Sequence, residues 1–114
     1  MDNWATPKWL MRMYEDWFDP CPFNPNWEID GLDLEWQDKT FVNPPYSKPM
    51  PWVKKAIETA KQGKRVVMLL NVDPSTKWYQ ELVFAGAKFS FFTSRLHFSE
   101  ATANVKPSML VFLG

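Results

Sequence analysis

The sequence is short of the residues that build metal sites and disulfides. Among its 114 residues there are one cysteine, Cys21, and one histidine, His97. A single cysteine excludes an internal disulfide, and one cysteine with one histidine supplies too few ligands for a zinc site. We therefore predict no metal centre. A lone thiol is also typical of a reducing compartment, and Cys21 is interpreted as a small packing residue.

The sequence also lacks net charge and long apolar runs. Thirteen basic residues balance 13 acidic ones, so bulk charge does not indicate nucleic-acid binding, which would need a local basic patch. No apolar run approaches the roughly 20 residues that span a bilayer, and no secretory signal pattern opens the chain. We expect a cytoplasmic protein that does not contact membranes.

The sequence is rich in apolar and aromatic residues and in proline. Hydrophobic residues make up 46% of the chain and aromatic residues 17%, and proline occurs ten times against four glycines. This composition is sufficient for a packed core at this length. We predict one domain that spans residues 1–114.

Local patterns predict alternating helices and strands. Thr6 is the expected N-cap of a helix that runs to about Glu15, Pro51 precedes a second helix that ends near Gly63, and Ser75 or Thr76 caps a third that ends at Gly86. Strands are expected at residues 17–19, 40–42, 65–70, 88–93 and 108–113, with a strand or turn at 95–98. This order predicts a compact α/β fold, mostly parallel, with antiparallel C-terminal strands.

Three polar residues follow expected strands. Asp19, Asn43 and Asn71 each stand at a strand's carboxyl end. Ligands of α/β sheets bind beyond these ends. The three residues therefore predict the location of a site.

The motif Asn43-Pro44-Pro45-Tyr46 has a specific chemical interpretation. Two prolines fix φ and make the loop rigid, so that the Asn43 side-chain oxygen and the Pro44 carbonyl can both accept from one amino group. An aromatic amine is a poor nucleophile because its lone pair is delocalised. Two fixed acceptors outside the ring plane favour the pyramidal amine of the transition state, and Tyr46 offers a face for stacking. The motif predicts methylation of an aromatic amino group.

The chain resembles the phage-type DNA adenine-N6 methyltransferase family over nearly its whole length. The resemblance implies a Rossmann-like methyltransferase fold, S-adenosylmethionine as methyl donor, and DNA as partner, with the target base flipped out of the stack. It is carried, in order, by Trp4-Ala5-Thr6-Pro7, Phe18-Asp19-Pro20-Cys21, Asp30-Gly31-Leu32 with Trp36, Phe41 to Ser47 with the following helix, Arg95-Leu96-His97-Phe98, and Pro107-Ser108.

The resemblance also implies roles for individual residues. Thr6 and Pro7 would lie near the carboxylate of the donor, and Asp19, followed by Pro20 and Cys21, near its ammonium group. Asp30 would accept from the donor's adenine, with Leu32 packed beside it and Asn43 close by. Thr6 as a plain N-cap and Asp30 as a simple Asp-Gly turn are equally weighted alternatives.

Contacts to DNA are expected from Tyr46, Ser47, Lys48 and Arg95. Lys48 is close enough to Tyr46 to reach the backbone of a flipped nucleotide, whereas Arg95 could contact DNA or a core carboxylate. The other basic residues after the loop are interpreted as a solvated helix face; they are Lys54, Lys55, Lys61, Lys64 and Arg65.

Two departures from the usual pattern leave alternatives open. Pro20-Cys21-Pro22 replaces the glycine-rich turn of most methyltransferases, and the segment from Asp19 to Asp30 is too short for a full strand-helix-strand unit. The alternatives are a protein-glutamine or cytosine-N4 methyltransferase, or an inactive relic of the fold that binds nucleic acid or protein. A homodimer that completes a DNA-binding surface is compatible with so small a domain, and the oligomeric state stays open.

Overall fold

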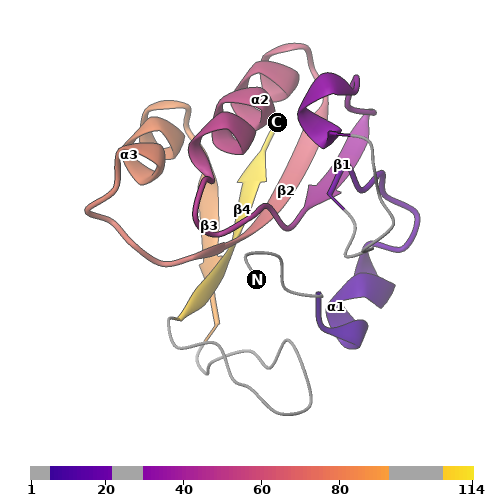
Figure 1. Cartoon of the computed structure of the whole chain (residues 1–114), viewed down its shortest axis with the longest axis horizontal. Helices are drawn as coiled ribbons and strands as arrows, with labels where there is room; N and C mark the ends of the chain where they lie inside the picture. Colours follow the sequence, from indigo (N-terminus) through magenta and orange to yellow (C-terminus); the bar gives the residue numbers. More distant parts are fainter. Residues whose placement is uncertain (1–5, 22–29, 93–106) are drawn as a thin grey trace.

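The computed structural model describes residues 6–21, 30–92 and 107–114, and these form a mixed sheet with helices on both faces (Figure 1). The predicted strand at residues 95–98 lies outside the described residues. The elements are α1 (Lys8–Met13), a 3-10 helix η1 (Gly31–Asp33), β1 (Lys39–Val42), α2 (Met50–Lys61), β2 (Arg65–Asn71), α3 (Lys77–Phe84), β3 (Lys88–Phe91) and β4 (Ser108–Leu113).

The sheet has the strand order β1-β2-β4-β3. β1 and β2 are parallel, and Val42 lies opposite Met68. β4 is antiparallel to both of its neighbours, with Ser108 opposite Asn71. The prediction of a compact α/β fold is confirmed, but the prediction of a mostly parallel sheet is wrong. The last strand inserts between β2 and β3, so two of the three neighbouring pairs are antiparallel.

The expected strand at residues 17–19 contributes one bridging residue. Phe18 N–H donates to the Lys39 carbonyl at 2.9 Å, and Phe41 N–H donates to the Phe18 carbonyl at 2.8 Å. These bonds form a parallel bridge between Phe18 and Thr40. Proline at position 20 has no N–H to donate to a ladder, so the chain leaves the sheet just after Asp19.

β2 is the centre of the core because its side chains alternate between two buried faces. Val66, Met68 and Leu70 pack with residues of α2 and α3. Val67 and Leu69 pack on the other face, together with Leu10 of α1. The molecule therefore has three layers, with the longer helices α2 and α3 on one face of the sheet and the short helix α1 on the other (Figure 1).

The boundaries of the helices follow their capping residues. α2 begins one residue before Pro51, which occupies its first turn. Of the two cap candidates for α3, Thr76 is the cap, since its hydroxyl accepts from the Tyr79 N–H at 3.3 Å. Gly63 and Gly86 follow α2 and α3 with φ of 89° and 80°. This left-handed conformation favours glycine at a helix end.

Candidate active site

The three polar residues predicted to mark a site lie at one edge of the sheet. β1 and β2 run in the same direction, and Phe18 is also parallel to β1. Asp19, Asn43 and Asn71 therefore all lie at the carboxyl ends of parallel segments, as predicted. This edge is where α/β sheets bind their ligands, and the site itself stays a prediction.

The predicted catalytic loop connects β1 to α2. Asn43 and Pro44 are buried, whereas Pro45 and Tyr46 are half-buried. Tyr46 packs against the α1-side core cluster, and burial raises the pKa of its hydroxyl. The tyrosine is therefore neutral at physiological pH, and it supplies a hydroxyl and a ring face, not a charge.

Thr6 orients the amide of Asn43. The Asn43 Nδ2 atom donates to the Thr6 hydroxyl oxygen at 3.2 Å. This bond directs the nitrogen end of the amide to Thr6 and leaves Oδ1 as the acceptor end of the group. Thr6 is not the N-cap of α1 as one interpretation predicted, because Pro7 holds that position, and no described side chain caps the helix.

The Pro7 carbonyl accepts the first backbone bonds of α1, from Leu10 N–H and Met11 N–H, each at 3.0 Å. Helix initiation therefore does not need the Thr6 hydroxyl. The hydroxyl is used by a residue 37 positions away in the sequence, a pairing that local spacing does not reveal.

Asp19 is a partly buried carboxylate at the end of its bridge. Burial raises the pKa of Asp19, and a hydrogen bond from the Cys21 N–H, 2.9 Å from Oδ1, opposes the shift. In the described part of the chain, no lysine or arginine forms an ion pair with Asp19. The carboxylate is thus held in place by backbone and is suited to a cationic ligand.

Cys21 is a neutral thiol. Burial, followed by the nearby charges of Asp19 and Asp30, raises the pKa of Cys21 to about 12. A thiolate is the reactive form of cysteine, so the thiol is unreactive, and its interpretation as a packing residue agrees with its place against the core.

Asp30 and Gly31 bring η1 against the Asp19 segment. The Asp30 Oδ1 atom accepts from the Leu32 N–H at 2.9 Å, which caps η1, and Leu32 packs on the core. Gly31 is buried, and a Cβ at this position would overlap the Pro20 carbonyl and touch the Trp52 ring. Only glycine allows this close approach.

Trp36 fixes the other end of the same segment. Its indole Nε1–H donates to the Gly31 carbonyl at 3.0 Å, and its ring stacks on Trp52 with centroids 6.1 Å apart. Sequence reasoning did not assign Gly31 and Trp36 these roles. Their spacing of five residues, a glycine followed by a large aromatic donor, was the available signal.

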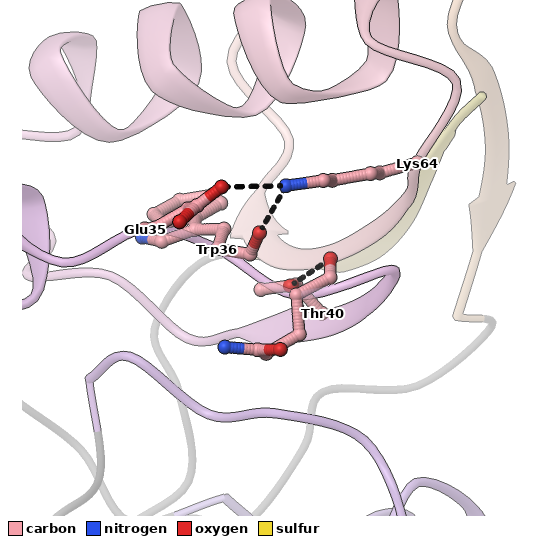
Figure 2. A network of polar contacts seen from close by, with 5 residues as sticks. Glu35, Trp36, Thr40 and Lys64 are labelled. Atoms are coloured by element: carbon pink, nitrogen blue, oxygen red, sulfur yellow. Dashed lines mark hydrogen bonds and ion pairs between the residues drawn. The ribbon is translucent and has the colours of Figure 1, made fainter.

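Two lysines, Lys55 and Lys64, bond to the segment from Gly31 to Trp36. The prediction that they belong to a solvated helix face was therefore wrong. Lys55 Nζ donates to the Leu32 carbonyl at 2.9 Å and lies 6.0 Å from the centroid of the Trp36 ring. Lys64 Nζ donates to the Trp36 carbonyl at 2.8 Å and lies 3.5 Å from Glu35 Oε1 (Figure 2). Backbone carbonyls of an irregular segment need donors, and these lysines supply them. Lys54, Lys61 and Arg65 are exposed as predicted.

Two pockets contain some of the predicted site residues. The Thr6 pocket, of about 290 Å³, is lined by Thr6, Met11, Arg12, Tyr14, Glu15, Trp17, Asp19 and Phe41. The Tyr46 pocket, of about 510 Å³, is lined by Tyr46, Ser47, Lys48, Pro49, Met50, Pro51, Leu70, Asn71, Asp73, Thr76 and Trp78.

Asn43 is not among the lining residues of either pocket, but its side chain contacts Thr6 of the first and its loop continues to Tyr46 of the second. Thr6 and Asp19, predicted to bind the donor, share the first pocket. Tyr46, Ser47 and Lys48, predicted to bind substrate, share the second. Arg95 lies outside the described residues.

The described ranges contain neither a metal-binding cluster nor a helix that could cross a membrane. No group of three or more His, Cys, Asp or Glu side chains there could hold a metal ion. No helix in the same ranges has the length and apolar character needed to cross a membrane.

The loop motif and the comparison with known proteins identify the class of protein to which the chain belongs. An Asn-Pro-Pro-Tyr loop at the carboxyl end of a parallel strand, next to a carboxylate-lined pocket, is typical of an amino-group methyltransferase. The family model for DNA N-6-adenine-methyltransferase (Dam) matches residues 1–113. The chain therefore belongs to the DNA N-6-adenine-methyltransferase family, and the predicted activity, adenine methylation in DNA, is confirmed.

Two curated relatives carry the same description. The DNA N-6-adenine-methyltransferase of Haemophilus phage HP1 (strain HP1c1) is 37% identical over 133 aligned positions, which cover 96% of this chain and 77% of the relative. That of Escherichia phage T1 is 49% identical over 41 positions, 36% of this chain and 17% of the relative. Both come from phages, which confirms the predicted phage-type resemblance. No solved structure matched the chain.

Proposed function

We propose that the chain transfers the methyl group of S-adenosylmethionine to N6 of an adenine that has left the DNA stack, with Asn43 and the Pro44 carbonyl as acceptors for the amine. The observation that carries this proposal is the Asn43–Thr6 hydrogen bond. It orients a buried amide so that its oxygen is the acceptor, at the edge of the sheet where ligands bind.

The residues of the Thr6 pocket fit an amino-acid-bearing cofactor. Asp19 is a partly buried carboxylate without a cationic partner among the described residues, and it suits an ammonium group. S-adenosylmethionine supplies an electrophilic methyl group on a sulfonium sulfur. In this interpretation Asp19 and Thr6 hold the amino-acid end, and Asp30 and Leu32 lie on the side of the donor's adenine.

The chain's own contribution to the reaction is preorganisation of the amine. Both N6–H groups donate, one to Asn43 Oδ1 and one to the Pro44 carbonyl, so the nitrogen becomes pyramidal and its lone pair is available. With the donor bound, this lone pair would accept the methyl group, and the donor's sulfur would keep the electron pair of the broken S–CH₃ bond. The product ammonium group then loses a proton to water, and no general base is needed.

The fold supports a single Rossmann-like methyltransferase domain. The parallel β1-α2-β2 unit places the loop beyond the strand ends, and every described strand belongs to one sheet. A base inside a duplex cannot present its amine to a buried loop, so the proposal includes DNA as partner with an extruded base.

The test is methyl transfer by Asn43→Ala. We expect the radiolabelled methyl group of S-adenosylmethionine to reach unmethylated DNA about 10²–10³-fold more slowly with this variant, the loss typical of one preorganised polar group. Asn43→Asp, which keeps an oxygen acceptor, should retain part of the activity. Both variants should unfold at temperatures close to that of the parent chain.

The proposal is wrong if Asn43→Ala methylates DNA at the parent rate. Acid hydrolysis of the labelled DNA identifies the methylated base. Label in N4-methylcytosine would support a cytosine-N4 methyltransferase, and label in a protein in place of DNA would support a protein-glutamine methyltransferase. If the parent chain neither transfers the methyl group nor binds the donor, the result would support an inactive relic of the fold.

A further inference from the structure

The Tyr46 pocket has a far wall to which the proposed mechanism assigns no role. The pocket is lined by Tyr46, Ser47 and Lys48 of the catalytic loop, and its lining also includes Asn71 of β2 and Trp78 of α3, which form what we call the far wall. Its volume of about 510 Å³ lies in the range of about 300–1,000 Å³ that is usual for small-molecule sites. The pocket is therefore large enough for a base with its sugar.

The chain holds the far wall in a fixed position. Thr76 Oγ1 donates to the Asp73 carbonyl at 2.8 Å, and Ser75 Oγ donates to Asp73 Oδ1 at 2.7 Å. The Thr76 hydroxyl also caps α3, so the turn between β2 and α3 is tied to the helix start. Trp78 lies in the first turn of α3, half-buried and packed against the main core.

The position of Asn71 is set by the sheet. It ends β2, is half-buried, and lies opposite Ser108 of β4. An amide carries a donor and an acceptor. Adenine places a ring-nitrogen acceptor on each side of its amine, at N1 and N7, whereas cytosine has a ring nitrogen on one side only. An amide donor on the N7 side of the amine can therefore distinguish adenine from cytosine.

We propose that the Tyr46 pocket is the base-accepting pocket, with Trp78 as a stacking wall and Asn71 as the donor that reads a ring nitrogen of adenine. This inference rests on the proposed function and names its specificity-determining residues. An extruded base loses its stacking neighbours, and aromatic side chains restore part of that contact. Lys48, exposed at the same pocket, then lies where the phosphate meets solvent.

The probe is deoxyadenosine 5′-monophosphate, titrated into the full chain without a methyl donor. We expect it to shift the indole N–H resonance of Trp78, assigned by its disappearance in Trp78→Phe. Deoxycytidine 5′-monophosphate should shift this resonance less. Trp78→Leu should weaken binding of the adenine nucleotide about fivefold or more, as for loss of one aromatic–base stack, whereas Trp78→Phe should retain most of it.

Asn71→Asp tests the reading of the base. The substitution replaces the donating NH₂ group by an oxygen, whose lone pair repels the lone pair of the adenine ring nitrogen. The variant should therefore lose the preference for adenine over cytosine. Phe84→Leu is the matched control, since Phe84 belongs to the same helix but is 89% exposed. It should leave both nucleotide affinities unchanged. Thermal unfolding of each variant shows whether a loss comes from the fold.

The inference is overturned if the adenine nucleotide fails to shift the Trp78 resonance up to its solubility limit, if cytosine gives an equal shift, or if folded Trp78→Leu binds like the parent. These outcomes do not depend on methyl transfer. If the parent chain methylates adenine and yet gives one of these three outcomes, the proposed function stands and the assignment of this pocket is wrong.

Discussion

The Thr6 pocket and the Tyr46 pocket lie on either side of Asn43 in the sequence of contacts, since Asn43 bonds to Thr6 and its loop leads to Tyr46, but the two pockets are built differently. The Thr6 pocket is bounded by α1 and by irregular backbone around Asp19, and it is held by single hydrogen bonds such as Asn43–Thr6 and Cys21–Asp19. The Tyr46 pocket is bounded by the starts of two helices and the end of the central strand. Regular elements share their stability among many bonds, whereas irregular backbone depends on individual side chains.

This difference predicts where single substitutions act. Near the Thr6 pocket, one changed residue should disturb the local arrangement of the site, because no ladder of bonds compensates. At the Tyr46 pocket, a changed side chain should alter binding while the fold remains. Each experiment below compares a substitution in or beside one pocket with a matched control.

The largest expected effect is that of Gly31→Ala. The added Cβ would overlap the Pro20 carbonyl, which is backbone and cannot move aside as a side chain can. We expect a loss of about 3 kcal/mol in unfolding free energy, at the upper end for overpacking, measured by urea denaturation. Gly63→Ala is the control: it has open space but φ of 89°, and a loss of about 1 kcal/mol is expected. A Gly31→Ala chain as stable as Gly63→Ala would contradict the close approach.

Next in size is Thr6→Val, which removes the acceptor for Asn43 Nδ2 at nearly constant volume. The amide can then rotate, and we expect kcat to fall about 10- to 100-fold, as for misplacement of a catalytic group, with little change in KM for DNA. Thr6→Ser keeps the hydroxyl and should retain most of the activity. An equal fall in both variants would show that the methyl group of Thr6 matters and not the hydrogen bond.

Asp19→Asn should separate stability from donor binding. Burial raises the pKa of Asp19, so the folded chain holds this proton more tightly than the unfolded chain. The resulting stability is fully present below the unfolded pKa and is lost as pH rises through the folded pKa. Asparagine has no such pH dependence and can still accept from the Cys21 N–H, so the variant should gain stability relative to the parent as pH rises to neutrality.

The same substitution should weaken S-adenosylmethionine binding about tenfold, measured by titration calorimetry, because a charge-assisted contact becomes a neutral one. Asp16→Asn, at an exposed neighbouring position, should change neither property. If Asp19→Asn bound the donor like the parent, the ammonium contact would be wrong while the stability effect could still hold.

Local signals in the sequence predicted the Tyr46 side of the molecule well. The Asn43–Tyr46 loop follows β1, residues 65–70 form most of the central strand, and Thr76 caps α3. Each of these features is determined within a few residues, by a proline pair, an apolar run or a capping hydroxyl. Their boundaries shifted by only one or two positions because helix and strand ends depend on the same short-range groups.

The features that sequence reasoning missed all depend on distant partners. The insertion of β4 between β2 and β3 depends on strand pairing that hydrophobic periodicity does not encode. Threonine is a common N-cap residue, so the sequence favours that role for Thr6. Only the fold shows that the Thr6 hydroxyl accepts a hydrogen bond from Asn43. Lys55 and Lys64 are on or after an amphipathic helix, where lysine is normally solvated, and their carbonyl partners lie 23 and 28 residues away.

The smallest expected effect is that of Lys48→Met at the Tyr46 pocket. Lys48 is exposed, so its loss should leave unfolding free energy within about 0.5 kcal/mol of the parent. If it contacts one phosphate, DNA affinity should fall a few-fold, and the slope of log affinity against log salt should decrease in magnitude by about one. Lys61→Met removes the same charge from the C-terminal end of α2 and should leave that slope unchanged. Equal slopes for both variants would mean that Lys48 acts through general charge, and the phosphate contact would have to be sought elsewhere on the rim.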